Sequence, residues 1–418
     1  MGGCAIRRIG RFSKGSGGTK ADEVSEGVPC IRYGDLYTSH KYHIRASRAF
    51  VTDTDALNYT SIRYGDILFA GSGETIEEIG KSAVNLIEQP ARCGGDVILF
   101  RPEREVDARF SGYAIDCPQS QSQKSTMGRG ITVMHIYGDE LKNLWIALPS
   151  LTEQRSIARY LDHVDRGIQR YIEAKEKLIT LLQEARQATI QRAVTRGLDP
   201  SAPLKPSGVD WLGDVPAHWE ISRVKSEFIS LNHRRVPLNA VERGEMKERR
   251  YDYYGASGVI DKVDHYLFDD ELLLIAEDGA NLVFRNLPLA IIARGKFWVN
   301  NHAHILKPRR GNLEFLAAVM EGLNYTPWIS GAAQPKLTQE RLMNIAIAVP
   351  SRSEQNEIMT KIESQTSELS AAIDNARRQV EFMTEYRSSL IAHVVTGKLD
   401  VRAAAEQLPQ ESRELAVS

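Results

Sequence analysis

Two long segments of this chain, residues 141–199 and 342–400, are copies of one another at a constant separation of 201 residues. Identical residues recur at this offset along the whole length of the segments, so the alignment needs no gap. The matches that open the segments are Leu141/Leu342, Asn143/Asn344, Ile146/Ile347, Ala147/Ala348, Pro149/Pro350, Ser150/Ser351, Glu153/Glu354, Gln154/Gln355 and Ile157/Ile358. Those that close them are Glu184/Glu385, Arg186/Arg387, Ile190/Ile391, Val194/Val395, Thr195/Thr396, Leu198/Leu399 and Asp199/Asp400. A gapless duplication of this length predicts that both segments fold alike.

Each copy opens with a short apolar run, 144–148 or 345–349, which ends at a proline and is followed by Ser-x-x-Glu. Short apolar runs bounded by a turn residue are typical of strands. The Ser-x-x-Glu pattern at 150–153 and 351–354 matches the capping box that begins many helices. We therefore expect a strand, a turn and the start of a helix in each copy.

Apolar residues then recur at alternating spacings of four and three, which is the pattern of a heptad seam. In the first copy they are Ile157, Leu161, Val164, Ile168, Tyr171, Lys175 (a polar member), Leu178, Leu182, Ala185 and Thr189, and in the second Ile358, Ile362, Leu369, Ala372, Ala376, Met383 and Leu390. Neither run contains a proline, so we expect two helices of roughly 40 residues and about 60 Å each. A long helix with one apolar stripe needs a partner, and the other copy is the simplest one, in either orientation. Two unrelated amphipathic helices on separate cores are the alternative.

Composition limits the class of protein. At 418 residues the chain is long enough for two or three domains, and its net charge of -1 argues against a generally basic nucleic-acid coat but not against local basic patches. The four cysteines show no C-x-x-C spacing, so neither a zinc knuckle nor a disulfide framework is indicated, and we expect a reducing compartment, the cytoplasm. No apolar run is long enough to span a bilayer, and no signal-peptide pattern is present.

The regions ahead of the two constant segments are mixed in character, with short apolar runs typical of strands between polar, glycine-rich loops. The expected strands are Ile67–Ala70 and Val97–Phe100 in the first region, and Leu272–Ala276, Ala290–Ala293 and His304–Leu306 in the second. We expect an α+β chain with a domain at 1–140, a strand and helix at 141–199, a connector at 200–216, a second domain at 217–341, a second strand and helix at 342–400, and a tail at 401–418. Similarity between the domains is weak, and its best candidates align Ile6–Ile9 with Ile221–Val224 and Asp66–Ala70 with Glu271–Ala276.

Motifs for catalysis are incomplete. Gly80-Lys81-Ser82 lacks the glycine that a phosphate-binding loop needs five residues earlier, where the chain has Thr75. Gly71-Ser72-Gly73 after an apolar strand is similar to the cofactor turn of a methyltransferase, but the Asn/Asp-Pro-Pro-aromatic signature of amino-methylating enzymes is absent. A tight turn in a binding loop is favoured there. We expect no catalytic residues and no cofactor in this chain.

Metal-binding patterns are also weak. Acidic residues at 269–271 and 277–278 could hold Mg²⁺ for a nuclease, but turns flanking a strand are the favoured interpretation. His302 and His304 lie on one face of an expected strand. Without a third nearby ligand, packing or a DNA contact is favoured over a metal site.

Polar loops in both domains carry the residue types that read base edges: Arg and Lys for guanine, Asn and Gln for adenine, Ser and Thr for either base or phosphate. The loops are Gln119–Thr126 with Arg129, Asn232–Arg235, and Gln334–Lys336. The candidate DNA-binding residues are Lys14, Lys20, Arg32, Ser72, Gln121, Gln123, Lys124, Arg129, Asn232, Arg234, Arg235, Tyr254, Ser257, Asn301, His302, Gln334 and Lys336. Each tract taken alone also fits an ordinary solvated loop.

Taken together, the chain resembles the DNA-specificity subunit of a type I restriction-modification system. The resemblance covers nearly the whole chain, and the segments that carry it are Leu148–Gln154, Arg192–Pro200, the connector Ser207–Trp219, Tyr254–Gly258, Glu277–Gly279 and Val394–Asp400. Members often begin with their own copy of the connector, which is missing ahead of Ile6. We expect that the true start lies elsewhere or that residues 401–418 supply the missing turn.

The resemblance implies two target-recognition domains held apart by an antiparallel coiled coil of the two long helices. Each domain would read one half of a split, asymmetric site in double-stranded DNA. The helices would dock two methylating subunits and, in the full complex, the translocating restriction subunits. Catalysis would belong to these partner subunits. No membrane is involved. Two alternatives stay open: a self-contained methyltransferase or nuclease with a duplicated scaffold, and a purely structural coiled-coil adaptor.

Overall fold

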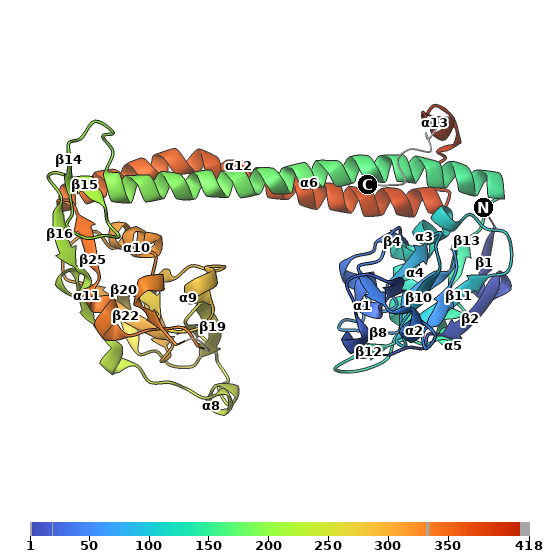
Figure 1. Cartoon of the computed structure of the whole chain (residues 1–418), viewed down its shortest axis with the longest axis horizontal. Coiled ribbons are helices and arrows are strands. Elements are labelled where there is room, and N and C mark those ends of the chain that lie inside the picture. Colours follow the sequence, from blue (N-terminus) through green and yellow to red (C-terminus); the bar gives the residue numbers. More distant parts are fainter. Residues whose placement is uncertain (1, 19, 332–333, 410–418) are drawn as a thin grey trace. The chain divides into compact units, whose positions relative to one another are not determined.

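The structure, a computed structural model, describes residues 2–18, 20–331 and 334–409 and divides the chain into two compact units. The first unit comprises residues 1–176 and 377–418, and the second comprises residues 177–376. Each unit holds one mixed domain and part of each long helix, α6 (Leu151–Arg196, 46 residues) and α12 (Arg352–Val395, 44 residues) (Figure 1). The expected α+β class and the two long helices are confirmed.

The domain of the first unit is built on a five-stranded sheet in the order β2-β11-β7-β9-β4. Its strands are β2 (Gly10–Lys14), β11 (Val97–Pro102), β7 (Ile67–Ala70), β9 (Ser82–Asn85) and β4 (Tyr42–Ile44). A four-stranded sheet adds β5 (Ala49–Val51), β3 (Val28–Ile31), β10 (Ala91–Cys93) and β6 (Thr60–Ile62), and two-stranded pairs join β1 (Gly3–Ala5) to β13 (Trp145–Ala147) and β8 (Ser72–Gly73) to β12 (Met134–His135). The helices of this domain are α1 (Tyr33–Thr38), α2 (Asp53–Ala56), α3 (Ala108–Asp116), α4 (Pro118–Met127) and α5 (Gly138–Leu141).

The domain of the second unit has a six-stranded sheet in the order β17-β22-β20-β21-β18-β19. Its strands are β17 (Phe228–Ser230), β22 (Ala303–Pro308), β20 (Phe268–Ala276), β21 (Ala290–Val299), β18 (Tyr251–Gly255) and β19 (Gly258–Val263). Smaller pairs join β14 (Leu204–Pro206) to β15 (Asp214–Pro216), β16 (Glu220–Arg223) to β25 (Ala346–Val349), and β23 (Ile329–Ser330) to β24 (Lys336–Leu337). The helices are α7 (Val224–Glu227), α8 (Ala240–Gly244), α9 (Asn281–Phe284), α10 (Leu313–Gly322) and α11 (Gln339–Asn344).

The first five strands of the two sheets correspond one to one. In both, three antiparallel neighbours are followed by a parallel one, β4 on β9 in the first unit and β18 on β21 in the second. The ladders also agree in register, with Gly10 opposite Pro102 where Phe228 is opposite Pro308, and Ala70 opposite Val97 where Ala276 is opposite Ala303. The duplication therefore includes the domains, although little sequence identity remains there.

This register tests the two weak alignments made from sequence. The match of β7 with β20 is confirmed because Ala70 and Ala276 occupy the same ladder position. The match of Ile6 with Ile221 is wrong by three residues. Ile6 donates its backbone NH to Leu144, and in the second unit it is Val224 that donates to the equivalent Ile345.

The two long helices pair in opposite directions within each unit. In the first unit Asp165 forms an ion pair with Arg387, and Tyr171 donates to Gln379 at 2.8 Å, so the α12 partner number falls as the α6 number rises. In the second unit Ala193 near the end of α6 shares a hydrophobic core with Ile358 near the start of α12. The expected antiparallel pair is confirmed in each unit.

The seam between the helices departs from the predicted heptads after Ile168. Tyr171 and Leu178 are 38% and 40% exposed, while Ile172 is buried and Ile179 half-buried. In α12 the predicted Ala372 is exposed and Ile373 is buried. The inward positions recur every eleven residues, at 157, 168, 179 and 190 and at 358, 369, 380 and 391. Eleven residues in three turns stay close to the natural α-helical period, whereas a heptad stripe drifts by about 20° per repeat.

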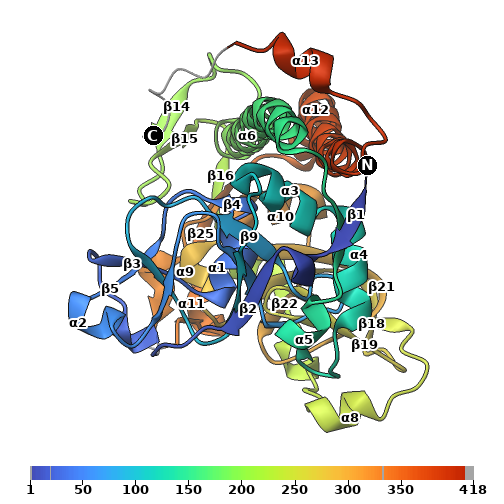
Figure 2. The same cartoon turned by 90° about the vertical axis from the view of Figure 1, so that its right-hand side faces the viewer.

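Equivalent glutamines attach each domain to the start of its long helix. Gln154 Oε1 accepts the backbone NH of Asp107 at 2.9 Å, and Asp107 caps α3. Gln355 Oε1 accepts the NH of Asn312 at 2.7 Å, and Asn312 caps α10. Figure 2 shows α3 directly beneath the helix pair of the first unit, where Phe110 joins the same core as α6 and α12.

The connector is anchored by its aromatic residues, as expected. Trp219 is 1% exposed and donates through Nε1 to Glu354 at 3.0 Å, and Trp211 packs edge-on against Trp328. The carboxylate of Glu354 thus binds the connector, while its backbone NH is capped by Ser351 at 3.3 Å. In the first unit α13 (Arg402–Glu406) follows α12, and the carbonyl of Leu408 accepts a hydrogen bond from Arg159 of α6.

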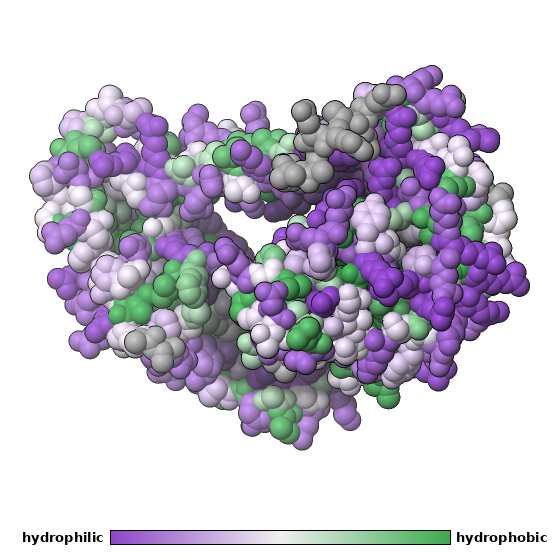
Figure 3. Space-filling model, turned by 45° about the vertical axis from the view of Figure 1, so that its right-hand side comes forward, coloured by the Kyte–Doolittle hydropathy of each residue, from purple (hydrophilic) through white to green (hydrophobic). Residues whose placement is uncertain are grey.

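The surface in Figure 3 carries hydrophobic residues scattered among hydrophilic ones. Among the described residues, none of the helices combines the length and the apolar character that crossing a membrane requires.

Candidate nucleic-acid interface

Predicted DNA-binding residues from distant parts of the sequence lie together at one equivalent place in each domain. At this place the chain continues past a strand of the main sheet and pairs with a strand of a small two-stranded sheet. In the first domain Gly71 donates its NH to Asp96 and accepts from Ile136, both at 3.0 Å. In the second, Glu277 donates to His302 at 2.9 Å and accepts from Leu337 at 2.8 Å. We call these two places the first corner (Lys14, Ser72, Asp96, His135, Tyr137) and the second corner (Asn232, Glu277, Asp278, His302, Lys336).

The matching backbone hydrogen bonds show which residue of the first corner is equivalent to which residue of the second. The equivalent pairs are Lys14/Asn232, Ser72/Asp278, Asp96/His302 and His135/Lys336. Five of these eight residues were predicted from sequence. His135, Asp96 and Asp278 were not among the residues predicted from sequence, although His135 lies 201 residues before the predicted Lys336 and is therefore its equivalent in the repeat.

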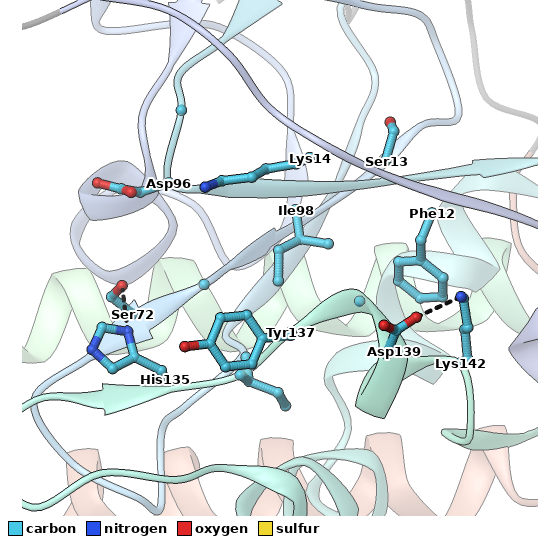
Figure 4. A pocket seen from close by; sticks show the side chains of 14 residues that line it. Phe12, Ser13, Lys14, Ser72, Asp96, Ile98, His135, Tyr137, Asp139 and Lys142 are labelled. Carbon is cyan, nitrogen blue, oxygen red and sulfur yellow. Dashed lines mark hydrogen bonds and ion pairs between the residues drawn. The ribbon is translucent and has the colours of Figure 1, made fainter.

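The first corner surrounds a pocket with a cavity volume of about 460 Å³ (Figure 4). Ser72 Oγ lies 3.2 Å from His135 Nδ1, and the His135 ring is stacked at 6.4 Å from that of Tyr137. Lys14, exposed at the end of β2, extends toward Asp96 in Figure 4. The pocket thus combines an aromatic face with a cation, a carboxylate and a hydroxyl.

The second corner is a network of charged groups around Glu277, whose side chain is 10% exposed. Arg235 forms an ion pair with one carboxylate oxygen, and Lys336 Nζ lies 3.3 Å from the other. Burial by itself would raise the pKa of Glu277, but the hydrogen bond and charge of Arg235 outweigh it and hold that pKa below its usual value. The carboxylate is therefore ionised, and it fixes the positions of the half-buried Arg235 and the exposed Lys336.

His304 supports this network from beneath as a neutral ring. Burial lowers its pKa, and its Nε2 donates to the carbonyl of Leu337 at 2.8 Å. The other ring nitrogen, Nδ1, then accepts from Asn232 Nδ2 at 2.8 Å. Asn232 also donates to Gln339 at 2.8 Å and accepts the NH of Ile305 at 2.8 Å, so both of its donors are engaged inside the domain and its predicted role in reading bases is not supported.

The outer side of the second corner is formed by His302 and Asp278, which lie 2.9 Å apart and whose side chains are 47% and 14% exposed. The adjacent Asn301 is exposed, and its carbonyl accepts from Arg235 at 3.3 Å. Tyr254 is close by, because its carbonyl accepts the NH of Asn300 at 3.0 Å.

Other predicted residues lie elsewhere in the two domains. Arg234 stacks its guanidinium over Phe268, at 4.7 Å from the ring centroid, and Arg32 pairs with Glu23 at 2.8 Å. Gln334 is exposed two residues before Lys336, Ser257 is exposed in the turn between β18 and β19, and Arg129 pairs with Glu140 at 3.3 Å. The side chain of Lys20 lies outside the described residues.

The tract predicted as a polar loop, Gln119–Thr126, is instead the helix α4. Pro118 occupies its first turn, where proline is favourable, and the rest of the helix lacks glycine. Gln121 donates to the carbonyl of Ile79 at 2.8 Å, and Gln123 exchanges bonds of 2.9 Å with the backbone of Trp145.

Lys124 of this helix is fully buried, with its ammonium 3.0 Å from Asp116, itself buried. Both amides and this ammonium are therefore engaged inside the domain. We exclude Lys124 from the interface and retain Gln121 and Gln123 only as structural residues.

The catalytic alternatives find no support in the geometry. Residues 269–271 lie within β20 rather than in a turn, and Asp270 pairs with Lys307. In the part of the chain that the structure describes, no group of three His, Cys, Asp or Glu residues is placed to hold a metal ion. Ser72 and Gly73 form the strand β8, so the cofactor turn is not present and the favoured prediction of a tight turn is also wrong.

Comparison with known families decides the relationship. The family model for the Type I restriction modification DNA specificity domain matches residues 12–181 and 216–377, which is most of the chain and includes both corners. The chain belongs to this family. The two matched regions also coincide with the structural duplication, because each contains one domain and the beginning of its long helix.

Individual relatives agree with this assignment. The chain is 24% identical to the type I restriction enzyme MjaVIII specificity subunit of Methanocaldococcus jannaschii, over 95% of this chain and 93% of that protein. A stretch of 117 residues is 37% identical to a putative type I restriction enzyme specificity subunit, S.HindORF215P, of Haemophilus influenzae, covering 28% of this chain and 30% of that one. A solved chain from a study of the assembly and conformational transition of the type I R-M system has the same fold, with a TM-score of 0.67, 14% identity, and coverage of 95% and 98%.

Proposed function

We propose that this chain is the DNA-recognition subunit of a type I restriction-modification complex and that each domain reads one half of a bipartite, asymmetric DNA site through its corner. The observation that carries the proposal is the pair of corners. They share a backbone framework and differ at every aligned side chain. This is the arrangement expected of two readers that descend from one domain and now specify different sequences.

The chemistry of the corners supports base reading. Lysine and arginine pair with guanine, asparagine with adenine, and carboxylates accept from the amino group of cytosine. The second corner presents Asp278, His302 and Lys336 on hydrogen-bonded backbone, and the first presents Lys14, Ser72 and His135. Because the two sets differ, the two half-sites differ, which makes the whole site asymmetric.

The helices supply the scaffold in this proposal. Each of α6 and α12 runs as one helix through residues of both units, and in this proposal the length of the helices sets the spacing of the two half-sites. Two methylating subunits and, in the full complex, the restriction subunits would dock on the constant segments and carry out the chemistry. In this proposal the chain itself is non-catalytic, and it works in the cytoplasm, where the DNA that it reads is found.

The test is DNA binding and methylation by the purified chain with and without its methylating partners. Sequence-specific methylation that requires both the partners and this chain supports the proposal. Methyl transfer to DNA by the chain alone would instead identify a self-contained enzyme. Absence of any sequence preference, even with the partners present, would leave only a structural adaptor.

A further inference from the structure

A short hairpin beside the first corner carries an apolar residue into solvent. Arg129 and His135 exchange two backbone hydrogen bonds of 2.9 and 2.7 Å, which close the hairpin. At its tip Ile131 is 98% exposed, and Val133 is 49% exposed. Gly130 has φ +140°, and a Cβ there would meet the carbonyl of Val133 at 2.1 Å, so the tip geometry requires this glycine. A fully exposed isoleucine on a defined turn suits insertion between stacked bases.

The pocket of the first corner begins at the base of the same hairpin, because His135 and Tyr137 line it. Its volume of about 460 Å³ lies within the range of small-molecule sites, roughly 300–1,000 Å³. Tyr137 is 58% exposed and offers a ring on which a planar base can stack. Ser72 and Asp96 supply the hydrogen-bonding groups that the edge of an unpaired base needs.

The second domain has different residues at the equivalent positions. Residue 138 is Gly in the first domain, and its mate 201 residues later is Gln339, whose side chain bonds to Asn232. Ile98, which lines the pocket, corresponds to His304, which fills the same place in the second corner. The mate of Ile131 in the sequence is Ala332, which lies outside the described residues.

We propose that the first domain turns one nucleobase out of its DNA half-site, with Ile131 entering the base stack and the first-corner pocket receiving the displaced base. This inference rests on the proposed function, since it assumes that the first corner faces DNA. Phe12 and Ile98 give the pocket an apolar floor, while Lys14 at the rim lies where the phosphate of the displaced nucleotide would be neutralised.

The experiment measures dissociation constants of the chain in complex with its methylating partners, on duplexes with one mismatch at each position of the first half-site in turn. Unpairing costs less at a mismatch, so a protein that extrudes that base binds the mismatched duplex more tightly. We expect about a tenfold tightening or more at one position. Two substitutions introduce the residue that the second domain has at the equivalent position. Gly138→Gln fills the pocket, and Ile131→Ala removes the side chain that would enter the base stack.

The Gly138→Gln substitution should fold, because a Cβ at this position meets Phe12 at 3.4 Å, which is van der Waals contact. We expect either substitution to abolish the tightening, while the second half-site is still recognised, which shows that the chain is folded. Leu57→Ala is the control, since Leu57 is 80% exposed in the same domain and is not among the residues that line the pocket, and it should leave the tightening in place.

Two results would contradict the inference but not the proposed function. One is that every mismatch in the first half-site weakens binding or leaves it unchanged while sequence preference persists. The other is a tightening that survives Gly138→Gln and Ile131→Ala, since it would then belong to a base extruded by a methylating partner. A complex with no sequence preference for matched DNA would contradict the proposed function itself, and the inference would fall with it.

Discussion

Four residues inserted into both long helices should lengthen the unread DNA between the two half-sites. The insertions follow Lys175 in α6 and Ala376 in α12, which are equivalent positions of the repeat. Lys175 is half-buried, with its ammonium over the Tyr171 ring, so the position tolerates a change better than an isoleucine of the seam.

The magnitude comes from helix geometry. Four residues add about 6 Å of helix, and duplex DNA advances about 3.4 Å per base pair. The same insertion rotates the remainder of the helix by about 40°, because four residues exceed one turn of 3.6. DNA turns about 34–36° per base pair. Length alone allows one or two added base pairs, and rotation selects one.

The assay is mapping of methylated adenines in cells that carry the variant together with its partner subunits. We expect both half-site sequences to be unchanged and the spacer to grow by one base pair. The control places the same four residues after Gly208, in the exposed turn of the connector, and should leave the spacer unchanged. A folded, active variant with insertions in both helices and an unaltered spacer would refute the claim that helix length sets the distance.

Three further predictions concern the domains. Replacing Gln154 or Gln355 with Ala removes the side-chain partners of one part-buried backbone NH and one backbone carbonyl, so each substitution should lower the unfolding free energy by about 1–3 kcal/mol, and the two effects should add because the residues belong to different units. Urea denaturation measures this, and a loss below 0.5 kcal/mol would argue against the attachment described (an order-of-magnitude threshold, about half a hydrogen bond). Replacing Gln334 and Lys336 together with Ala should weaken binding to the cognate site and relax discrimination at one or two positions of one half-site, at about 1–3 kcal/mol per bidentate contact; unchanged affinity and specificity would remove this loop from the interface. The lowered pKa of Glu277 stabilises the fold at pH values above 4.5, the usual pKa of the carboxyl group, and this stability is lost as pH falls below that value. Glu277→Gln should therefore reduce the melting temperature at pH 7, while in acid the melting temperatures of the variant and the unaltered protein should become equal. An equal difference in melting temperature at both pH values would contradict the ion-pair account.

The helices were predictable because their signals are local and repeated. A gapless offset of 201 residues, a proline after each strand and the Ser-x-x-Glu starts located α6 and α12 to within a few residues. The seam failed after Ile168 because heptad and eleven-residue spacings share the same steps of four and three and separate only over several turns. Ile172 and Ile179 were visible in the sequence, but Tyr171 and Leu178 fitted the heptad equally well.

The candidate site was less predictable because it depends on strand register. Lys14, Ser72, Asn232, His302 and Lys336 were chosen for residue type, and only the paired ladders show that they form two equivalent corners. Composition misled most in the tract 119–126, whose glutamines and serines suggested a solvated loop. Tertiary contacts decide its structure, since the amides bond to backbone carbonyls that are distant in sequence.

Exchange of the first domain tests the central claim, that the two domains are separate readers of separate half-sites, most directly. Residues 1–140 are replaced with the matching domain of a relative that has a different target, and methylated adenines are mapped in cells that carry the chimera and its partner subunits. The account predicts that one half-site takes the sequence of the relative while the other half-site and the spacer stay unchanged. A chimera that folds and methylates but alters both half-sites together would contradict it.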